Sequence, residues 1–97
     1  MVKHIILWKL KSEFNTEEIK ADMKKTLEAL VGVVPGLVEL KLQTEKLPTS
    51  SADVMLYSVL ESPEGLANYA THPEHLKAAD TKVRPFVESK LCLDFEL

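Results

Sequence analysis

The sequence has little of several features, and each shortage excludes a class of protein. Its one cysteine, Cys92, cannot form an internal disulfide, and we interpret the thiol as a small buried hydrophobe in an apolar strand. The longest apolar run, Ile5 to Trp8, falls far short of the roughly 18 residues of a membrane span and is too short for a signal-peptide core. We therefore expect a cytoplasmic protein with no membrane partner.

Charge of either sign is scattered along the chain. Twelve basic and 15 acidic residues give a formal net charge of −3, and no block of lysine and arginine is present of the kind that a phosphate backbone requires. No glycine-rich phosphate loop, paired-carboxylate group or Ser/His/Asp arrangement is recognisable. These absences argue against nucleic acid as a partner and against nucleotide-binding or hydrolase function.

The 97 residues, of which 45% are hydrophobic, predict one domain over residues 1–97. Apolar periodicity predicts the order strand, helix, strand, strand, helix, strand. Asn15 is the expected N-cap of the first helix, in a capping box with Glu18, and a buried stripe runs from Ile19 to Val31. The expected strands cover residues 2–11, 37–44, 54–60 and 90–97, and the second helical region covers residues 63–84 with a break before Pro73.

Two right-handed crossovers joining these strands predict an antiparallel four-stranded sheet in the order 4-1-3-2. This is the α+β, ferredoxin-like βαββαβ arrangement, with the helices on one face. The other face then carries apolar residues that no helix reaches, and we expect two chains to cover these faces as a homodimer, a dimeric α+β barrel. The apolar residues of this face are Ile5, Leu7, Met55, Tyr57 and Val59.

Five segments carry a resemblance to a known family. They are Val2–Leu7, Val34–Gly36, Leu60–Ser62, Tyr69–His75 and Val83–Pro85, and the tyrosine followed by His-Pro-x-His is the most specific of them. The chain resembles the stress-responsive dimeric α+β barrel family, Dabb, over nearly its whole length. The resemblance implies a dimer of ferredoxin-like subunits. Members range from plant stress proteins to a polyketide cyclase that uses no metal or organic cofactor.

The resemblance to that cyclase implies roles for particular residues. Its catalytic tyrosine and histidine correspond to Tyr69 and His75, and a histidine that lines its pocket corresponds to His4. A further pocket histidine corresponds to Val54, where this chain has no imidazole. The implied activity is cofactor-free lyase, cyclase or isomerase chemistry, and the change at Val54 leaves the reaction and the substrate open.

The residues themselves support two interpretations of the segment from Tyr69 to His75. In the first, the helix dipole keeps His75 neutral so that it can accept a proton, while Tyr69 polarises a carbonyl in a pocket that His4, Trp8 and His72 also line. In the second, the segment is a structural corner, where His72 caps backbone groups and the Tyr69 hydroxyl bonds backbone. The corresponding functions are binding or catalysis on a small carbonyl compound, and a non-catalytic stress or assembly role.

A metal site at His72, Glu74 and His75, with His4 as a further candidate ligand, is the remaining alternative for this segment. Because His72 precedes Pro73, its backbone is biased away from the helical region, and this separates the two imidazoles. We therefore expect no metal and no cofactor.

Overall fold

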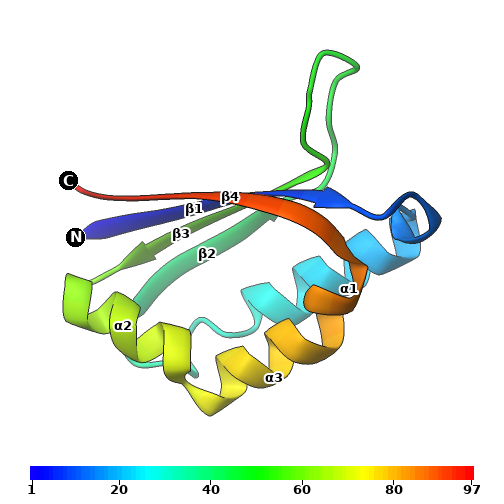
Figure 1. Cartoon of the computed structure of the whole chain (residues 1–97). Helices are drawn as coiled ribbons and strands as arrows, with labels where there is room; N and C mark the ends of the chain where they lie inside the picture. The colour runs from blue at the N-terminus through cyan, green and yellow to red at the C-terminus, as the bar shows by residue number, and fades with distance from the viewer.

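The computed structural model describes all 97 residues as one sheet with helices on one side (Figure 1). The strands are β1 (Val2–Leu10), β2 (Leu37–Gln43), β3 (Val54–Leu60) and β4 (Val87–Glu96); the helices are α1 (Glu17–Glu28), α2 (Pro63–Thr71) and α3 (Pro73–Lys82). Short 3₁₀ helices, Ser12–Phe14 and Arg84–Phe86, precede α1 and β4. None of the helices has the length and apolar character needed to cross a membrane.

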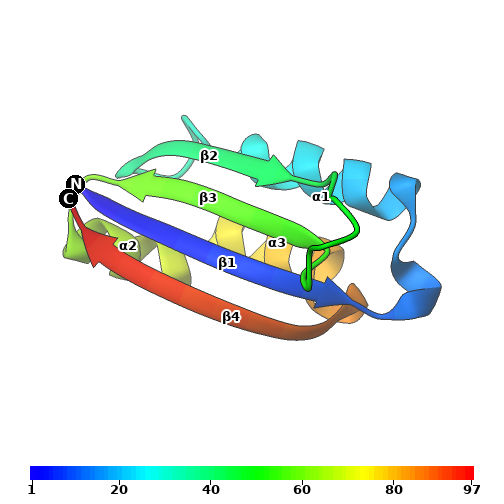
Figure 2. The same ribbon diagram turned by 90° about the horizontal axis from the view of Figure 1, so that it is seen from above.

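The strands lie in the order β2-β3-β1-β4, and each neighbouring pair is antiparallel. The predicted order 4-1-3-2 and the ferredoxin-like fold are therefore confirmed. Seen from above, the helices lie beneath the sheet and β4 forms its outer edge (Figure 2). The register places His4 of β1 between Ser58 of β3 and Asp94 of β4.

The core lies between the sheet and the helices. Alternation along β1 and β3 sends one set of side chains toward the helices, where they meet the buried stripe of α1. Ser58 is fully buried in this layer, and its hydroxyl donates to the carbonyl of His4 at 3.0 Å. No buried side-chain polar atom lacks a partner, so this core incurs no unpaired polar group.

The start of α1 differs from the prediction. Thr16 is the N-cap, and its hydroxyl accepts from the backbone N–H of Ile19 at 3.3 Å. Asn15 instead ends the preceding 3₁₀ helix, where its N–H donates to the carbonyl of Ser12. Because the cap lies one residue later than expected, Ile19 takes the third helical position, and the predicted capping box with Glu18 does not form.

Three further details correct the sequence prediction. The buried stripe does not extend to Val31, which is exposed because α1 has ended and the chain turns through Gly32 at φ 88°. The last strand begins at Val87, three residues earlier than predicted. Cys92 is exposed instead of buried, because it belongs to the edge strand, where it faces a pocket.

The face of the sheet opposite the helices is largely apolar. Leu7, Leu91, Leu93 and Phe95 are exposed on it, and the pairing of β1 with β4 sets Leu7 beside Leu91. The β2–β3 loop rises on this same side of the sheet (Figure 1). An apolar face of this extent is characteristic of a contact surface.

Substitution Leu60→Ala should reduce the free energy of unfolding by about 2–5 kcal/mol, because Leu60 is 0% exposed and truncation leaves a cavity. Urea unfolding at fixed protein concentration measures the loss. Leu47→Ala is the matched control, since Leu47 is 71% exposed in the β2–β3 loop and should change the free energy by less than about 0.5 kcal/mol. Equal losses in both variants would contradict the assigned core.

Candidate functional site

A pocket of about 520 Å³ lies between the β1–β4 side of the sheet and helices α2 and α3. Its walls are mainly apolar, with aromatic and imidazole rings and a few charged groups. The residues that line it are His4, Ile6, Trp8, Leu66, Tyr69, Ala70, His75, Ala79, Val83, Arg84, Val87, Glu88, Ser89, Lys90 and Cys92. The volume and the apolar character are those of a site for a small organic molecule.

The break between α2 and α3 arranges the side chains of this pocket. Pro73 has no N–H, so the carbonyl of Tyr69 accepts instead from the N–H of His72 at 3.2 Å. In a continuous helix the N–H of Glu74 would donate to Ala70, but here it donates to Nδ1 of His72 at 3.1 Å. The carbonyl of Ala70 is thereby left without its helical partner.

His75 supplies the missing donor. Its Nδ1–H donates to the carbonyl of Ala70 at 3.2 Å, which fixes the tautomer and leaves Nε2 with a free lone pair. Burial lowers the pKa of His75 below its ordinary value, and the nearby cation Arg84 adds to this, although the bond to Ala70 opposes it. The imidazole is therefore neutral near pH 7, with one nitrogen able to accept a proton.

Tyr69 lies directly beside His75. Their ring centroids are 4.3 Å apart, with the planes at 72°, and the His4 ring meets Tyr69 edge-on at 6.2 Å. Tyr69 is 2% exposed, and burial raises its pKa to about 12 with no hydrogen-bond partner contributing. Its hydroxyl thus stays protonated at the pocket, where it can donate to a ligand.

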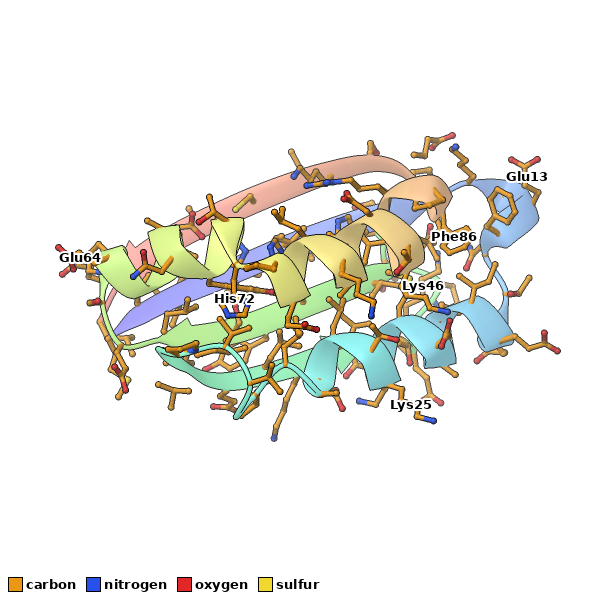
Figure 3. All side chains as sticks on the ribbon, turned by 90° about the horizontal axis from the view of Figure 1, so that it is seen from below. Glu13, Lys25, Lys46, Glu64, His72 and Phe86 are labelled. Atoms are coloured by element: carbon orange, nitrogen blue, oxygen red, sulfur yellow. The ribbon has the colours of Figure 1, made fainter.

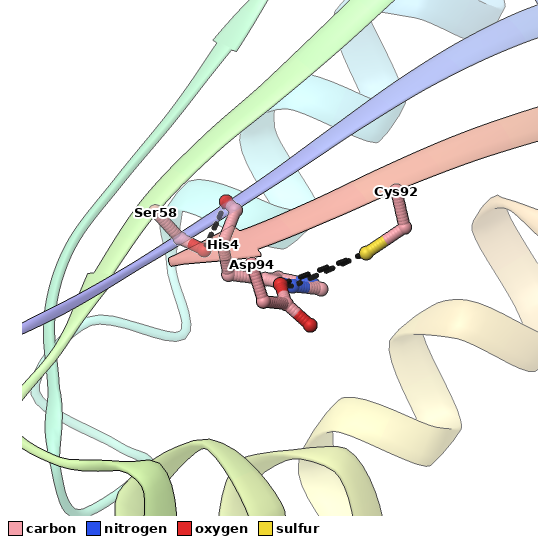
Figure 4. A network of polar contacts seen from close by, with 4 residues as sticks. All are labelled: His4, Ser58, Cys92 and Asp94. Atoms are coloured by element: carbon pink, nitrogen blue, oxygen red, sulfur yellow. Dashed lines mark hydrogen bonds and ion pairs between the residues drawn. The ribbon is translucent and has the colours of Figure 1, made fainter. Parts of the chain in front are cut away.

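His4 is held from the other side by β4 (Figure 4). Its Nδ1 and the carboxylate of Asp94 form a hydrogen-bonded pair, and the Cys92 sulfur lies 3.7 Å from the same nitrogen. Cys92 also lies 3.6 Å from the Asp94 carboxylate. Burial, together with the charge of Asp94, raises the pKa of the Cys92 thiol.

Four of the predicted site residues line this pocket, and two lie outside it. His4, Trp8, Tyr69 and His75 all line the pocket. His72 does not, because its ring caps α3 at the junction of the two helices (Figure 3).

Val54 also lies outside the pocket. It pairs with Trp8 across the sheet, is buried in the core and is not among the residues that line this pocket.

Sequence reasoning missed Cys92 and Asp94. Their spacing of two places both on one face of a strand, but only the β1–β4 register shows that His4 lies beside that face.

Comparison with known proteins identifies the family. The model of the stress-responsive A/B barrel domain, Dabb, matches residues 2–97. This chain belongs to the Dabb family. Among curated proteins, a stress-response A/B barrel domain-containing protein of Arabidopsis thaliana is 28% identical over 96 residues, which cover 98% of this chain. The Dabb chain described here spans only 36% of that relative's length.

Solved structures share the same Dabb fold. A dimeric protein of unknown function with a ferredoxin-like fold from Bacteroides fragilis is 30% identical, with a TM-score of 0.88 over 99% of this chain and 95% of that one. A hydroxynitrile lyase from Passiflora edulis is 20% identical, with a TM-score of 0.84 over 99% of this chain and 92% of that one. At that identity the second likeness shows the fold alone.

The lowered pKa of His75 predicts a pH dependence of stability. Between the folded pKa and the unfolded value of about 6.5, the unfolded chain binds more protons, so the free energy of unfolding falls as pH drops below about 6.5. The contribution is fully present above that pH. Thermal unfolding between pH 5 and 8 should show the fall, and His75→Gln should flatten it. A wild-type slope that persists unchanged in the variant would assign the effect to other groups.

Proposed function

We propose that this Dabb protein is a homodimer that binds a small carbonyl-bearing organic molecule in the pocket and removes a proton from the carbon next to the carbonyl. The class of activity is cofactor-independent lyase, cyclase or isomerase chemistry. His75 is the base and Tyr69 polarises the carbonyl. His4 and Trp8 line the pocket around the substrate.

One observation carries this proposal. The Tyr69 side chain is buried, but its hydroxyl opens onto the pocket and has no hydrogen-bond partner in the chain. The Tyr69 ring lies against an imidazole whose tautomer is fixed and whose lowered pKa favours the neutral form. A purely structural tyrosine at this burial is expected to bond a neighbouring group. A donor left free beside a proton acceptor is the arrangement that enolisation requires.

Nε2 of His75 takes the proton, the electron pair of the C–H bond moves into the new carbon–carbon double bond, and negative charge develops on the carbonyl oxygen. The Tyr69 hydroxyl donates to that oxygen and lowers the energy of the enolate. The enolate carbon then attacks a second carbonyl, whose oxygen takes the proton from His75, or accepts that proton itself. Alternatively the enolate expels a leaving group from the adjacent carbon, and the leaving group takes the proton from His75.

The walls of the pocket support this chemistry. Trp8, Leu66 and Val83 supply apolar surface around the two polar groups, which limits water and strengthens the hydrogen bond to the developing charge. The volume of about 520 Å³ suits a small organic molecule. The name of the Passiflora protein adds that a lyase occurs on this fold.

Proton exchange tests the proposed base and donor. The wild-type protein should exchange the α-protons of at least one compound in a panel of small ketones and ketoesters in D₂O, followed by NMR. Removal of the base in His75→Ala should slow exchange about 10²–10⁴-fold, and Tyr69→Phe should slow it about 10²–10³-fold.

Tyr57→Phe is the matched control for Tyr69→Phe. Tyr57 lies on the opposite face of the sheet, where the Lys3 ammonium sits over its ring, so its removal should leave exchange unchanged. Equal exchange by wild type and His75→Ala across the whole panel would eliminate His75 as the base. It would favour the non-catalytic stress or assembly role.

The homodimer is proposed to form through the apolar sheet face. Dimers are described for the Bacteroides neighbour and for a ferredoxin-like neighbour from Thermobifida fusca. Here the edge strand offers Leu91 and Leu93 beside Leu7 of β1, and self-association would remove all three from water.

Sedimentation at micromolar concentration should give a dimer for the wild type and a monomer for Leu93→Glu, because the variant places a charge in the apolar contact. Leu93 is 64% exposed in the single chain, so the change should not disturb the subunit core. Val33→Glu is the control on the helix side of the molecule and should remain dimeric. A dimeric Leu93→Glu variant would move the interface elsewhere.

A further inference from the structure

A second group of reactive side chains lies at the sheet edge and has no part in the proposed proton transfer. His4 of β1 and Cys92 and Asp94 of β4 each offer one ligand atom, and these atoms lie within 4.8 Å of one another. Figure 4 shows the Cys92 sulfur pointing from its strand toward the point where the His4 ring and the Asp94 carboxylate meet. The three donors come from two strands, so the sheet itself holds them together.

The convergence is explained by the strand register. Cys92 and Asp94 are two residues apart in β4 and therefore project to the same face, toward α2 and α3. His4 pairs directly with Asp94, and Ile6 pairs with Cys92, so the His4 ring is a cross-strand neighbour of both. The backbone hydrogen bonds of the sheet thus fix the origins of all three side chains before any ion is present.

Two of the three ligand-to-ligand distances fit a tetrahedral transition metal. Zinc bonds of about 2.3 Å to sulfur and about 2.0–2.1 Å to nitrogen or oxygen require the sulfur to lie about 3.6 Å from each of the other two ligand atoms. The Cys92 sulfur lies 3.7 Å from His4 Nδ1 and 3.6 Å from the Asp94 carboxylate. The sulfur is therefore already at a suitable distance from both of the other ligand atoms.

For His4 and Asp94 to bind the same metal ion, the contact between their ligand atoms must widen. His4 Nδ1 and Asp94 are now joined by a hydrogen bond, and a metal would take the place of the hydrogen between them. The Asp94 side chain is 42% exposed, so its carboxylate has room to rotate. A thiolate, a carboxylate and a neutral imidazole together carry two negative charges, which balance a divalent cation.

We propose that His4, Cys92 and Asp94 form a binding site for a divalent transition metal of the zinc class. Thiolate and imidazole are the ligands that select zinc over magnesium or calcium. Three protein ligands leave the fourth position open, and two of the three, His4 and Cys92, line the pocket.

Metal binding would also change whether the second ring nitrogen of His4 donates or accepts a hydrogen bond. With the metal on Nδ1, the ring proton must lie on Nε2, so the second nitrogen becomes a hydrogen-bond donor. With the proton on Nδ1, facing Asp94, the second nitrogen is an acceptor. The ion would therefore reverse the polarity of His4 without moving its strand.

Cobalt(II), a coloured stand-in for zinc, tests the site directly and needs no substrate. Titration of the purified protein should give one Co²⁺ per chain, with the near-ultraviolet charge-transfer absorption of a thiolate ligand and the strong visible bands of tetrahedral coordination. Because Cys92 is the only cysteine, this absorption reports on it alone. Zinc should displace the cobalt and abolish both signals.

Variants identify the other two ligands. His4→Gln and Asp94→Asn should each weaken cobalt binding by at least about tenfold, with circular dichroism to show that each variant is folded. Glu96→Gln removes a carboxylate two residues further along β4 and should bind as the wild type does.

Absence of the charge-transfer absorption in the wild type would overturn the proposal. So would absorption that His4→Gln and Asp94→Asn leave at full affinity, since the thiol would then bind metal without its neighbours. Both results are independent of the proton-exchange assay, because neither Tyr69 nor His75 is a proposed ligand.

Discussion

The site depends on the missing N–H of Pro73. Because the helix cannot continue through this residue, the carbonyls of its preceding turn need other donors. The His72 side chain replaces one missing helical hydrogen bond by accepting from the N–H of Glu74, and the His75 side chain replaces another by donating to the carbonyl of Ala70. The two imidazoles therefore have different roles. Nδ1 of His72 is occupied as a helix cap, whereas His75 keeps a free nitrogen in the pocket.

The pocket itself follows from the edge position of β4. The main contacts of α2 with the sheet are to β1, β2 and β3, while β4 packs mainly against β1. Cys92 is exposed for this reason, although its strand alternates as a half-buried one should. The uncovered stretch provides the space into which Tyr69 and His75 project from the opposite layer.

Much of this fold could be predicted from the sequence, because alternation, proline positions and crossover handedness each depend on local residues and agree with one another. The predictions fail where the role of a residue depends on a neighbour in space that the sequence pattern does not reveal. Asn15 and Thr16 are both good N-caps, and the preceding 3₁₀ helix, which the pattern did not reveal, takes up the first. The resemblance predicts Val54 in the pocket, yet Val54 is buried in the core and does not line it. Asp94 was overlooked because nothing in its own strand indicates the histidine beside it.

The two faces of β4 link the pocket to the proposed dimer. Leu91 and Leu93 point to the open face, while Cys92 and Asp94 point to the helix side, so a shift of one residue would exchange the two sets. β4 pairs with a single strand and has little helical cover, which leaves its register dependent on β1 and on whatever covers the apolar face. A partner sheet packed there would favour the observed register, since the shifted one would bury a carboxylate in the contact. Dimerisation would thereby hold His4 and its neighbours in place without contributing a residue to the pocket.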